Sequence, residues 1–420
     1  MSLEFNEDNL IDLCELVTDG SHHSPPSQVE GYYMASVKDM GTYKFNYSDC
    51  RKISEEDYNK LVKSGCSPKN DDILIAKDGS PLSNIFIYKE EYPIVLLSSI
   101  AIIRPNKSKI LPEFLKYYLE NHSIKRYIQT TYTSGSVIPR IILKDFKKFP
   151  IIYPNLENQK KIIGILRTID KKIAINEEIN RNLYEILINN FNVIFDHEDK
   201  DCKLSDIVNI RRGASPRPIK DYISDTGINW LKIADVTGTE MPFIYKIKEK
   251  IIEEGKSKSV FIKKGTLVVS NSATPGIPKF IMVDTCVHDG WLVLNGYEDN
   301  LRYYLYFLIV KIRKELINLA YGSVFNNLKT DTLKNYEISK PKDDQLDRFN
   351  KIAKPIMEKI DSNTKEIMML SKLRDTLLPK LMSGEIDVSK INCDMLQTSR
   401  KNWNNEFTLT LQDNLIEVIS

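Results

Sequence analysis

A long internal repeat limits the possible folds of this chain more than any other feature of the sequence. Four segments of the first half match four of the second half in the same order: 13–25 with 204–216, 72–79 with 266–273, 114–119 with 300–305, and 135–137 with 322–324. The four offsets all fall between 186 and 194. Because chance matches would not keep both order and offset, we predict two copies of one unit of about 190 residues, followed by a tail.

Each copy ends in a segment with helical periodicity, which we predict at about residues 158–195 and 346–381. Apolar residues recur there at alternating steps of three and four, as in the seam of a coiled coil. A helix of about 38 residues spans on the order of 57 Å, far more than one domain core needs. These helices are therefore predicted to act as spacers or docking rods.

Polar residues interrupt the two seams in matching places. Asn363 in the second segment lies 187 residues after Asn176 in the first, so the interruption repeats as well. Pro355 lies inside the second segment, where a proline removes a backbone donor and clashes with the preceding turn. We therefore expect the second helix either to restart at Pro355 or to kink there.

The two segments that precede the helices mix short apolar strand-like runs with a few helical ones. That mixture favours an α+β fold over a regular series of parallel βαβ units. The expected organisation is a first globular domain at 1–154, a spacer helix at 155–196, a second globular domain at 197–341, a second spacer helix at 342–384 and a C-terminal tail at 385–420.

Composition excludes several classes of protein. With 59 Lys and Arg against 57 Asp and Glu, the net charge of +2 does not fit a uniformly basic nucleic-acid coat protein. Six cysteines without a C-x-x-C pair, and only five histidines, argue against a zinc site or a disulfide framework. No apolar run of membrane-spanning length and no signal peptide is found, so we expect a cytoplasmic protein.

Catalytic motifs are missing from the sequence. It has no P-loop, H-E-x-x-H, G-x-S-x-G or dinucleotide-binding glycine motif, and no N-P-P-Y or D-P-P-Y of an adenine methyltransferase. Residues 254–256 end like some nuclease sites, but no aspartate on a preceding strand accompanies them. We therefore expect no catalytic residue, no metal and no cofactor in this chain.

Charge is sorted by region. Residues 1–30 carry seven acids and no Lys or Arg, whereas residues 203–220 carry five Lys or Arg and one acid. Arg211, Arg212 and Arg217 lie in a Gly/Pro turn, and their planar guanidinium groups suit phosphates or guanine edges. The matching turn of the first copy offers Ser21, His22 and His23 instead. Solvated surface is the plainer reading of any single lysine cluster, but two equivalent turns with different polar residues suggest two readers of different sequences.

Four further motifs then match a known family: GSVIPR at 135–140, FPIIYP at 149–154, NQKKI at 158–162 and LRDTLLPKLMSGEI at 373–386. Over about residues 10–390 the chain resembles the specificity subunit of type I restriction-modification systems. The resemblance implies two target-recognition domains, each reading one half of a split site in double-stranded DNA. It also implies that the two spacer helices pair as an antiparallel coiled coil.

The same resemblance implies partners and excludes catalysis by this chain. Two methyltransferase subunits and the restriction subunits would assemble on it, and the methyltransferase would bring S-adenosylmethionine. The second copy departs from the first after its shared Gly-Ser-Val, where Phe325, Asn326 and Asn327 replace Ile138, Pro139 and Arg140.

Candidate DNA contacts are polar or basic residues in the turns of both domains: Ser21, His22, His23, Lys77, Ser80, Ser134, Ser136, Arg140, Arg211, Arg212, Ser215, Arg217, Lys220, Asn271, Ser272, Lys279, Asn326, Asn327 and Lys329. Candidate pairing residues lie on the two helical seams: Ile162, Leu166, Ile169, Ile173, Asn176, Leu183, Leu187, Ile356, Ile360, Asn363, Ile367, Leu370 and Leu377.

Two other functions compete with this one. A stand-alone DNA-modifying or DNA-cleaving enzyme with two recognition domains would be active without partners, and the missing motifs argue against it. A coiled-coil interaction protein without a DNA role would not depend on Arg211, Arg212 and Arg217 for DNA binding.

Overall fold

The computed structural model describes residues 4–135, 137–196, 200–321 and 327–390. The chain forms two compact units. The first comprises Met1–Lys172 and Met369–Ser420, and the second comprises Ile173–Met368. Part of the predicted tail, from residue 391 onward, lies outside the described residues.

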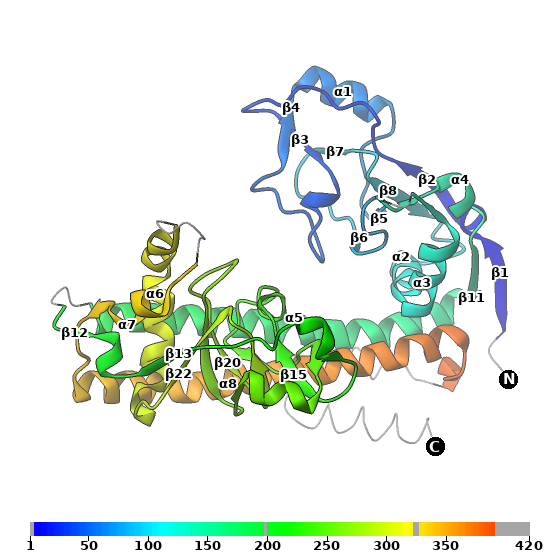
Figure 1. Ribbon diagram of the computed structural model, residues 1–420. Helices are drawn as coiled ribbons and strands as arrows, with labels where there is room; N and C mark the ends of the chain where they lie inside the picture. Colours follow the sequence, from blue (N-terminus) through cyan, green and yellow to red (C-terminus); the bar gives the residue numbers. More distant parts are fainter. Residues whose placement is uncertain (1–3, 136, 197–199, 322–326, 391–420) are drawn as a thin grey trace. The chain divides into compact units, whose positions relative to one another are not determined.

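The first unit is built on two small sheets (Figure 1). The main sheet is antiparallel, with the order β2 (Cys14–Asp19), β8 (Ile100–Pro105), β5 (Ile73–Ala76), β6 (Ile85–Ile87). The second sheet has the order β4 (Arg51–Ile53), β3 (Tyr32–Ala35), β7 (Ile94–Leu96). β1 (Phe5–Asn9) pairs with β11 (Pro150–Pro154), and β9 (Thr133–Ser134) with β10 (Arg140–Ile141). Every residue of β5 is buried, as its unbroken apolar run predicts.

The helices of the first unit begin at recognisable signals. α1 (Glu55–Lys63) is capped by Ser54, whose side chain accepts from the Asp57 amide. α2 (Pro112–Glu120) begins at a proline, which fits the first turn of a helix. α3 (His122–Thr131) is capped by Asn121, and the short α4 (Leu143–Phe146) follows β10.

The second unit repeats this plan with additional strands. Its main sheet has the order β13 (Asn209–Arg212), β22 (Trp291–Asn295), β19 (Thr266–Ser270), β20 (Pro278–Ile281), β16 (Phe243–Ile244). Its second sheet has the order β14 (Ile223–Ser224), β17 (Glu249–Ile251), β15 (Ile228–Leu231), β21 (Thr285–Val287), β18 (Val260–Ile262). β12 (Cys202–Lys203) pairs with β23 (Glu337–Ile338), and the helices are α6 (Arg302–Tyr321) and α7 (Thr330–Lys334).

The sheet orders of the two units correspond strand by strand. The order β2-β8-β5-β6 corresponds to β13-β22-β19-β20, and β4-β3-β7 corresponds to β17-β15-β21. Even the directions agree, because β3 with β7 and β15 with β21 are both parallel pairs. The predicted mixture of helices and sheets, built twice, is therefore what the chain forms.

Two long helices carry the predicted seams. α5 runs over Leu156–Ile194 and α8 over Asp343–Ser383. α8 continues through Pro355, so the predicted restart there is wrong. Within the second unit, α5, α6 and α8 share an aromatic core in which the rings of Phe191 and Phe349 lie 5.4 Å apart and those of Phe307 and Phe349 lie 5.7 Å apart.

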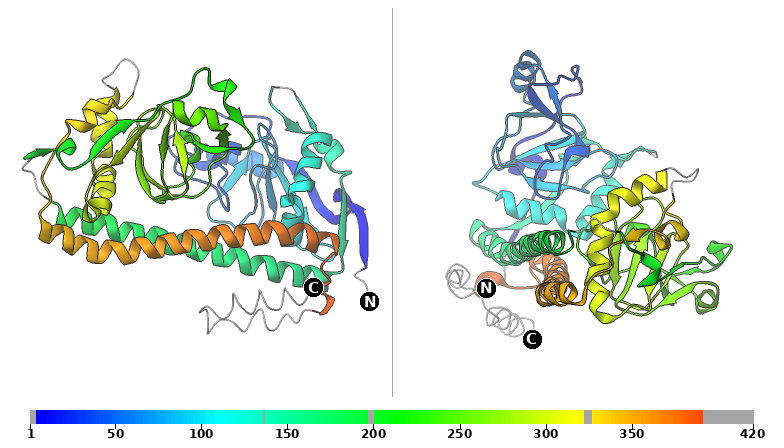
Figure 2. Two further views of the ribbon diagram at one scale, coloured as in Figure 1. Left: turned by 60° about the horizontal axis from the view of Figure 1, so that its bottom comes forward. Right: turned by 90° about the vertical axis from the view of Figure 1, so that its left-hand side faces the viewer.

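Buried asparagines make polar contacts between α5 and α8. In the second unit the Nδ2 of Asn363 donates to the Oδ1 of Asn180 at 2.9 Å, and Asn176 donates to Glu366 at 2.8 Å. Residue numbers rise on one helix as they fall on the other, so the two segments of this unit run antiparallel (Figure 2). In the first unit Arg374 of α8 donates to Asp170 of α5 at 3.1 Å.

The buried face of α8 differs in part from the predicted seam. Met357 and Ala353 are fully buried, whereas Ile356 and Ile352 are only partly buried against the same core. Ile360 and Asn363 are buried as the seam requires, and Ile367 and Leu370 are half-buried. The predicted seam therefore passes through Ile356, whereas the buried face passes through Met357, one residue later. The spacing could not separate them, because neighbouring apolar residues fit either face there.

Replacing Asn180 and Asn363 together by leucine is expected to raise the midpoint of thermal unfolding of the full chain. The pair is buried, and the Oδ1 of Asn363 has no hydrogen-bond partner. Removing both polar partners can be neutral or stabilising, whereas N363L alone would strand Asn180 at a cost of about 1–3 kcal/mol. Calorimetry on both variants checks this expectation, and a double variant less stable than N363L would contradict it.

Candidate nucleic-acid interface

In the first unit three separate segments meet beyond the ends of β2 and β5. The Lys77 amide donates to the Ser99 carbonyl at 2.9 Å, and the Ile141 amide donates to the Lys77 carbonyl at 3.0 Å. The Ser98 amide donates to the Ser21 carbonyl at 2.9 Å. These bonds bring together the turn after β2, the turn after β5 and the end of the β9–β10 hairpin, which lie far apart in the sequence.

The second unit makes the same junction with different residues. The Asn271 amide donates to the Gly290 carbonyl at 2.9 Å, and the Leu328 amide donates to the Asn271 carbonyl at 2.8 Å. Asn271 thus occupies the place of Lys77, and Leu328 the place of Ile141. The repeated backbone carries different side chains, which is the pattern expected of two readers with different targets.

A close backbone approach fixes how the two turns correspond. A Cβ on Gly20 would lie 2.2 Å from the Leu96 carbonyl oxygen, and one on Gly213 would lie 2.1 Å from the His288 carbonyl oxygen. Only glycine fits at both places. Gly20 therefore corresponds to Gly213, and Asp19 to Arg212. The predicted alignment of residues 13–25 with 204–216 is therefore wrong by two residues in these turns.

Close contacts between basic and acidic side chains link the predicted residues of the first unit. The Oδ2 of Asp19 lies 2.8 Å from the Nζ of Lys77 and 3.3 Å from the Nε2 of His22. Lys77 in turn lies 3.8 Å from Asp78, and the Nε of Arg140 lies 3.0 Å from the same Oδ1 of Asp78. His22, Lys77 and Arg140 are therefore gathered in one place by Asp19 and Asp78, which were not among the predicted residues.

The other candidates of the first unit differ in exposure. His23, Ser80 and Ser134 are exposed, whereas Ser21 is buried and its hydroxyl donates to the His23 carbonyl at 2.7 Å. Ser21 therefore shapes the turn. Ser136 lies outside the described residues.

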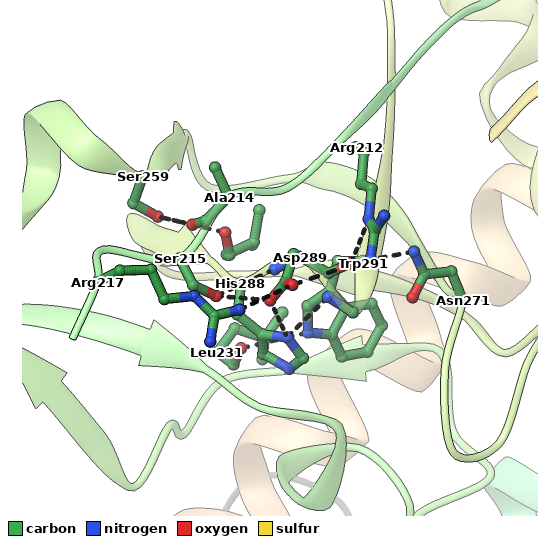
Figure 3. Close-up of polar contacts among 12 residues, drawn as sticks. Arg212, Ala214, Ser215, Arg217, Leu231, Ser259, Asn271, His288, Asp289 and Trp291 are labelled. Atoms are coloured by element: carbon green, nitrogen blue, oxygen red, sulfur yellow. Dashed lines mark hydrogen bonds and ion pairs between the residues drawn. The ribbon is translucent and has the colours of Figure 1, made fainter. Parts of the chain in front are cut away.

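Asp289 is the centre of the corresponding site in the second unit (Figure 3). Its carboxylate accepts from the hydroxyl of Ser215 at 2.6 Å and from the Nη2 of Arg217 at 3.2 Å. Its backbone carbonyl accepts from the Nε of Arg212 at 2.7 Å and from the Nδ2 of Asn271 at 3.0 Å. Four predicted residues thus converge on one residue that the sequence did not single out.

The carboxyl group of Asp289 is held in its ionised form, in which it can orient the two arginines. Burial alone would raise the pKa of its carboxyl, but the Ser215 hydroxyl, its own backbone amide and the charge of Arg217 more than offset burial. The net result is a pKa below the ordinary value, so the carboxylate stays charged and keeps the two arginines oriented.

Two aromatic side chains, those of His288 and Trp291, lie next to Asp289 and are held by hydrogen bonds. Burial lowers the pKa of His288, and its Nδ1 accepts from the Gly290 amide at 2.7 Å. The indole of the buried Trp291 donates to the Leu231 carbonyl at 3.2 Å. Asp289, on which the arginines converge, therefore lies next to aromatic side chains that are held by hydrogen bonds.

Lys279 lies in the interior, although it was predicted to contact DNA. Its side chain is 2% exposed, and its Nζ donates to the carbonyls of Thr239 and Met241 at 2.7 and 2.6 Å. It fastens the segment before β16 and faces no surface that DNA could reach. We leave it out of the proposed interface.

The burial of Lys279 should make the stability of the chain depend on pH. Burial lowers its pKa from 10.5 to about 8. Between these values the unfolded chain binds more protons than the folded one, so the free energy of unfolding rises with pH. Between pH 8 and 10.5 the free energy of unfolding of the wild type should rise by about 3 kcal/mol relative to that of Lys279→Met. Denaturant unfolding of both proteins at several pH values measures this difference, and a constant difference would contradict the account.

The remaining candidates of the second unit lie at or near its surface. Arg211, Lys220 and Lys329 are exposed, and Ser272 and Asn327 are half-buried. Asn326 lies outside the described residues.

The described residues form neither a cluster of metal ligands nor a membrane-spanning helix. No group of three or more His, Cys, Asp or Glu side chains among them is arranged to hold a metal ion. None of the helices formed by the described part of the chain is long and apolar enough to cross a membrane.

Comparison with known proteins agrees with the repeated fold. The family model of the type I restriction modification DNA specificity domain matches residues 9–185 and again residues 198–372. The type I restriction enzyme MjaIX specificity subunit of Methanocaldococcus jannaschii is 25% identical over 407 residues, covering 88% of this chain and 91% of its own. The HindI specificity subunit of Haemophilus influenzae is 25% identical over 382 residues, covering 72% and 83%.

A solved structure shares the fold. The S subunit of a type I restriction-modification system from M. genitalium superposes with a TM-score of 0.55 at 15% identity, covering 90% of this chain and 96% of its own. Because the family model matches most of the sequence in two tandem copies, the chain belongs to the family of type I restriction modification DNA specificity domains. The predicted resemblance is confirmed, and the two relatives are named as specificity subunits.

Proposed function

We propose that this chain reads a bipartite target in double-stranded DNA, with one half-site for each unit. The observation that carries the proposal is the repeated three-segment junction, which exposes His22 and Arg140 around the buried Lys77 in one unit and presents Arg212, Ser215 and Arg217 in the other. Arginine forks and histidine donors suit phosphates and base edges, and two readers in one chain suit two half-sites at a fixed spacing.

Under this proposal α5 and α8 pair as an antiparallel coiled coil that sets the gap between the half-sites. The buried pair Asn180–Asn363 supports it, because a polar pair in a seam fixes register. The proposed target-recognition domains are 1–154 and 197–341, and the spacers are 155–196 and 342–384. The 385–420 tail is given no role.

The chain would also act as a scaffold for two modification subunits and the restriction subunits. On the part of α5 that belongs to the second unit, Ile175, Ile179, Ile186 and Val193 are 44%, 37%, 45% and 73% exposed. Their spacings of four, seven and seven residues place them on one face, about a quarter-turn from the buried seam. An exposed apolar stripe of this kind suits a helix of a partner subunit.

The charge variant I179E/I186E tests this docking face. We expect it to lower co-purification with the modification subunit at least tenfold, because a partner helix would have to bury two carboxylates. Ala174→Glu, which is exposed on another face of α5, is the matched control and should co-purify normally. Equal recovery of both variants would contradict the assignment.

A methylation assay tests the proposed function against the enzyme alternative. The purified chain alone, supplied with S-adenosylmethionine and duplex DNA, should neither methylate nor cleave. Addition of the modification subunit should produce adenine methylation. Activity of the isolated chain would favour a stand-alone enzyme, and a complex that methylates without sequence preference would overturn the recognition role.

A further inference from the structure

We propose that Val137 and Ile138, at the tip of the β9–β10 hairpin, form an apolar wedge that enters the base stack of the half-site read by the first unit. The inference rests on the proposed function and deepens it, because it assigns to this unit a deformation of the duplex in addition to base contacts. Neither residue was among the predicted DNA contacts.

The hairpin presents two large apolar side chains to solvent. Val137 is 90% exposed and Ile138 is 62% exposed. β9 and β10 are joined by only two residue pairs, Ser134 with Arg140 and Thr133 with Ile141. An apolar pair this exposed costs free energy in water, and burial of both side chains against a ligand would recover it.

The base of the hairpin is anchored, so the wedge is a shaped element. The Gly79 amide donates to the Pro139 carbonyl at 2.9 Å, and the Ile142 amide donates to the Tyr132 carbonyl at 2.9 Å. Gly135 has a φ of +95°, and a Cβ there would lie 2.6 Å from the Ile138 carbonyl oxygen. Glycine is therefore required for the turn that brings Val137 and Ile138 to the tip, and the hairpin projects from its unit (Figure 2).

Charge next to the wedge favours nucleic acid as its partner. The stretch 122–148 carries six Lys or Arg against one Asp, Asp145. A hollow of about 470 Å³ lies between α3 and the turn after β5, and it is lined by Leu82, Ser83, His122, Lys125, Arg126 and Gln129. Gln129, one of the lining residues, donates to the Pro81 carbonyl at 2.7 Å. Basic side chains in such a hollow suit phosphates, whereas an exposed apolar pair suits the space between bases.

A wedge also fits the chemistry that the partner would perform. A methyltransferase must take its target base out of the stack, and the gap that is left costs stacking energy. Apolar side chains that fill or open a base step lower this cost. In the sequence, the second copy keeps two apolar residues, Val324 and Phe325, at the same place in the repeat, although they lie outside the described residues.

The variant V137S/I138S in the assembled complex with the modification subunit tests the wedge. The probe is a duplex target with 2-aminopurine at the methylated adenine, whose fluorescence rises when the base leaves the stack. We expect the variant to lose most of the fluorescence rise and at least tenfold in methylation rate, while DNA affinity falls by less than about tenfold. Val29→Ser, at a valine that is 94% exposed elsewhere in the same unit, is the control.

The outcomes separate this inference from the proposed function. A wild-type complex that binds DNA without sequence preference would overturn both. A wild type that binds specifically, beside a V137S/I138S variant with unchanged fluorescence rise and rate, would overturn the wedge alone. Loss of the modification subunit from the variant complex would show that the pair docks protein and would also overturn the wedge. A target mismatched at the adenine should restore much of the variant's methylation rate, because an unpaired base is easier to extrude.

Discussion

Replacing Arg211, Arg212 and Arg217 together by alanine is expected to remove recognition of the half-site assigned to the second unit, and with it most of the specific DNA binding by the assembled complex. A well-placed bidentate contact to a base contributes about 1–3 kcal/mol, which corresponds to roughly tenfold to a hundredfold in affinity for each such arginine. Arg212 and Arg217 are oriented by Asp289, so little ordering entropy remains to be lost when they bind. We therefore expect affinity to fall by at least a hundredfold.

Fluorescence anisotropy on specific and unrelated duplexes, at two salt concentrations, measures this loss. The triple variant should lose its preference for the half-site of the second unit and show a shallower dependence on salt, because fewer counterions are released. Arg348→Ala, at an exposed arginine on α8 of the same unit, is the matched control and should bind normally. Unchanged specificity in the triple variant would place the reader elsewhere and would favour an interaction protein without a DNA role.

The largest expected effect on stability belongs to Asp72, at the start of β5. Its carboxylate is fully buried and accepts two hydrogen bonds from Arg104 of β8, at 2.8 and 2.7 Å, and one from the Lys69 amide at 2.7 Å. Asp72→Asn would leave the Arg104 guanidinium without its counter-charge. Breaking a fully buried pair on one side costs about 3–5 kcal/mol, and because Arg104 is 21% exposed we expect the lower end of that range.

The neighbouring aspartate provides the comparison. Asp71 pairs with Lys89 and Lys107, both of which are largely exposed. Pairs of this kind contribute about 0–1 kcal/mol, so Asp71→Asn should cost little. The free energies of unfolding of the two variants, measured with denaturant, should therefore differ by more than about 2 kcal/mol. Equal free energies would contradict the importance given to the pair of Asp72 and Arg104. Since β5 leads directly to Lys77 and Asp78, Asp72→Asn should also weaken the first half-site.

The two long helices could be predicted from the sequence because the same apolar spacing recurs over many residues in each of them. α5 spans Leu156–Ile194 where 158–195 was predicted, and α8 spans Asp343–Ser383 where 346–381 was predicted. The buried face was harder to place, because Met357 and Ile356 are both apolar and adjacent. Which of them turns inward depends on tertiary packing that no local pattern contains.

The candidate site could be predicted only in part. The arginine turn was found because three guanidinium groups in a Gly/Pro context are conspicuous. Asp19, Asp78 and Asp289 were missed because acids are not sought where a polyanion binds. A signal was present for two of them, since Asp78 and Asp289 each follow closely on a buried strand, whereas Asp19 ends the half-buried β2. Lys279 was misplaced because its charge suggested a surface, whereas its position inside the apolar strand β20 indicated burial.

The central claim is that one chain reads two separated half-sites, and mapping adenine methylation across a genome tests it most directly. The chain would be expressed with its modification subunit in a host that lacks other adenine methyltransferases. We predict methylation at a motif of two short defined sequences separated by a gap of constant length and arbitrary sequence. The triple arginine variant should lose the dependence on one of these sequences and retain the other. A single continuous motif would contradict the account.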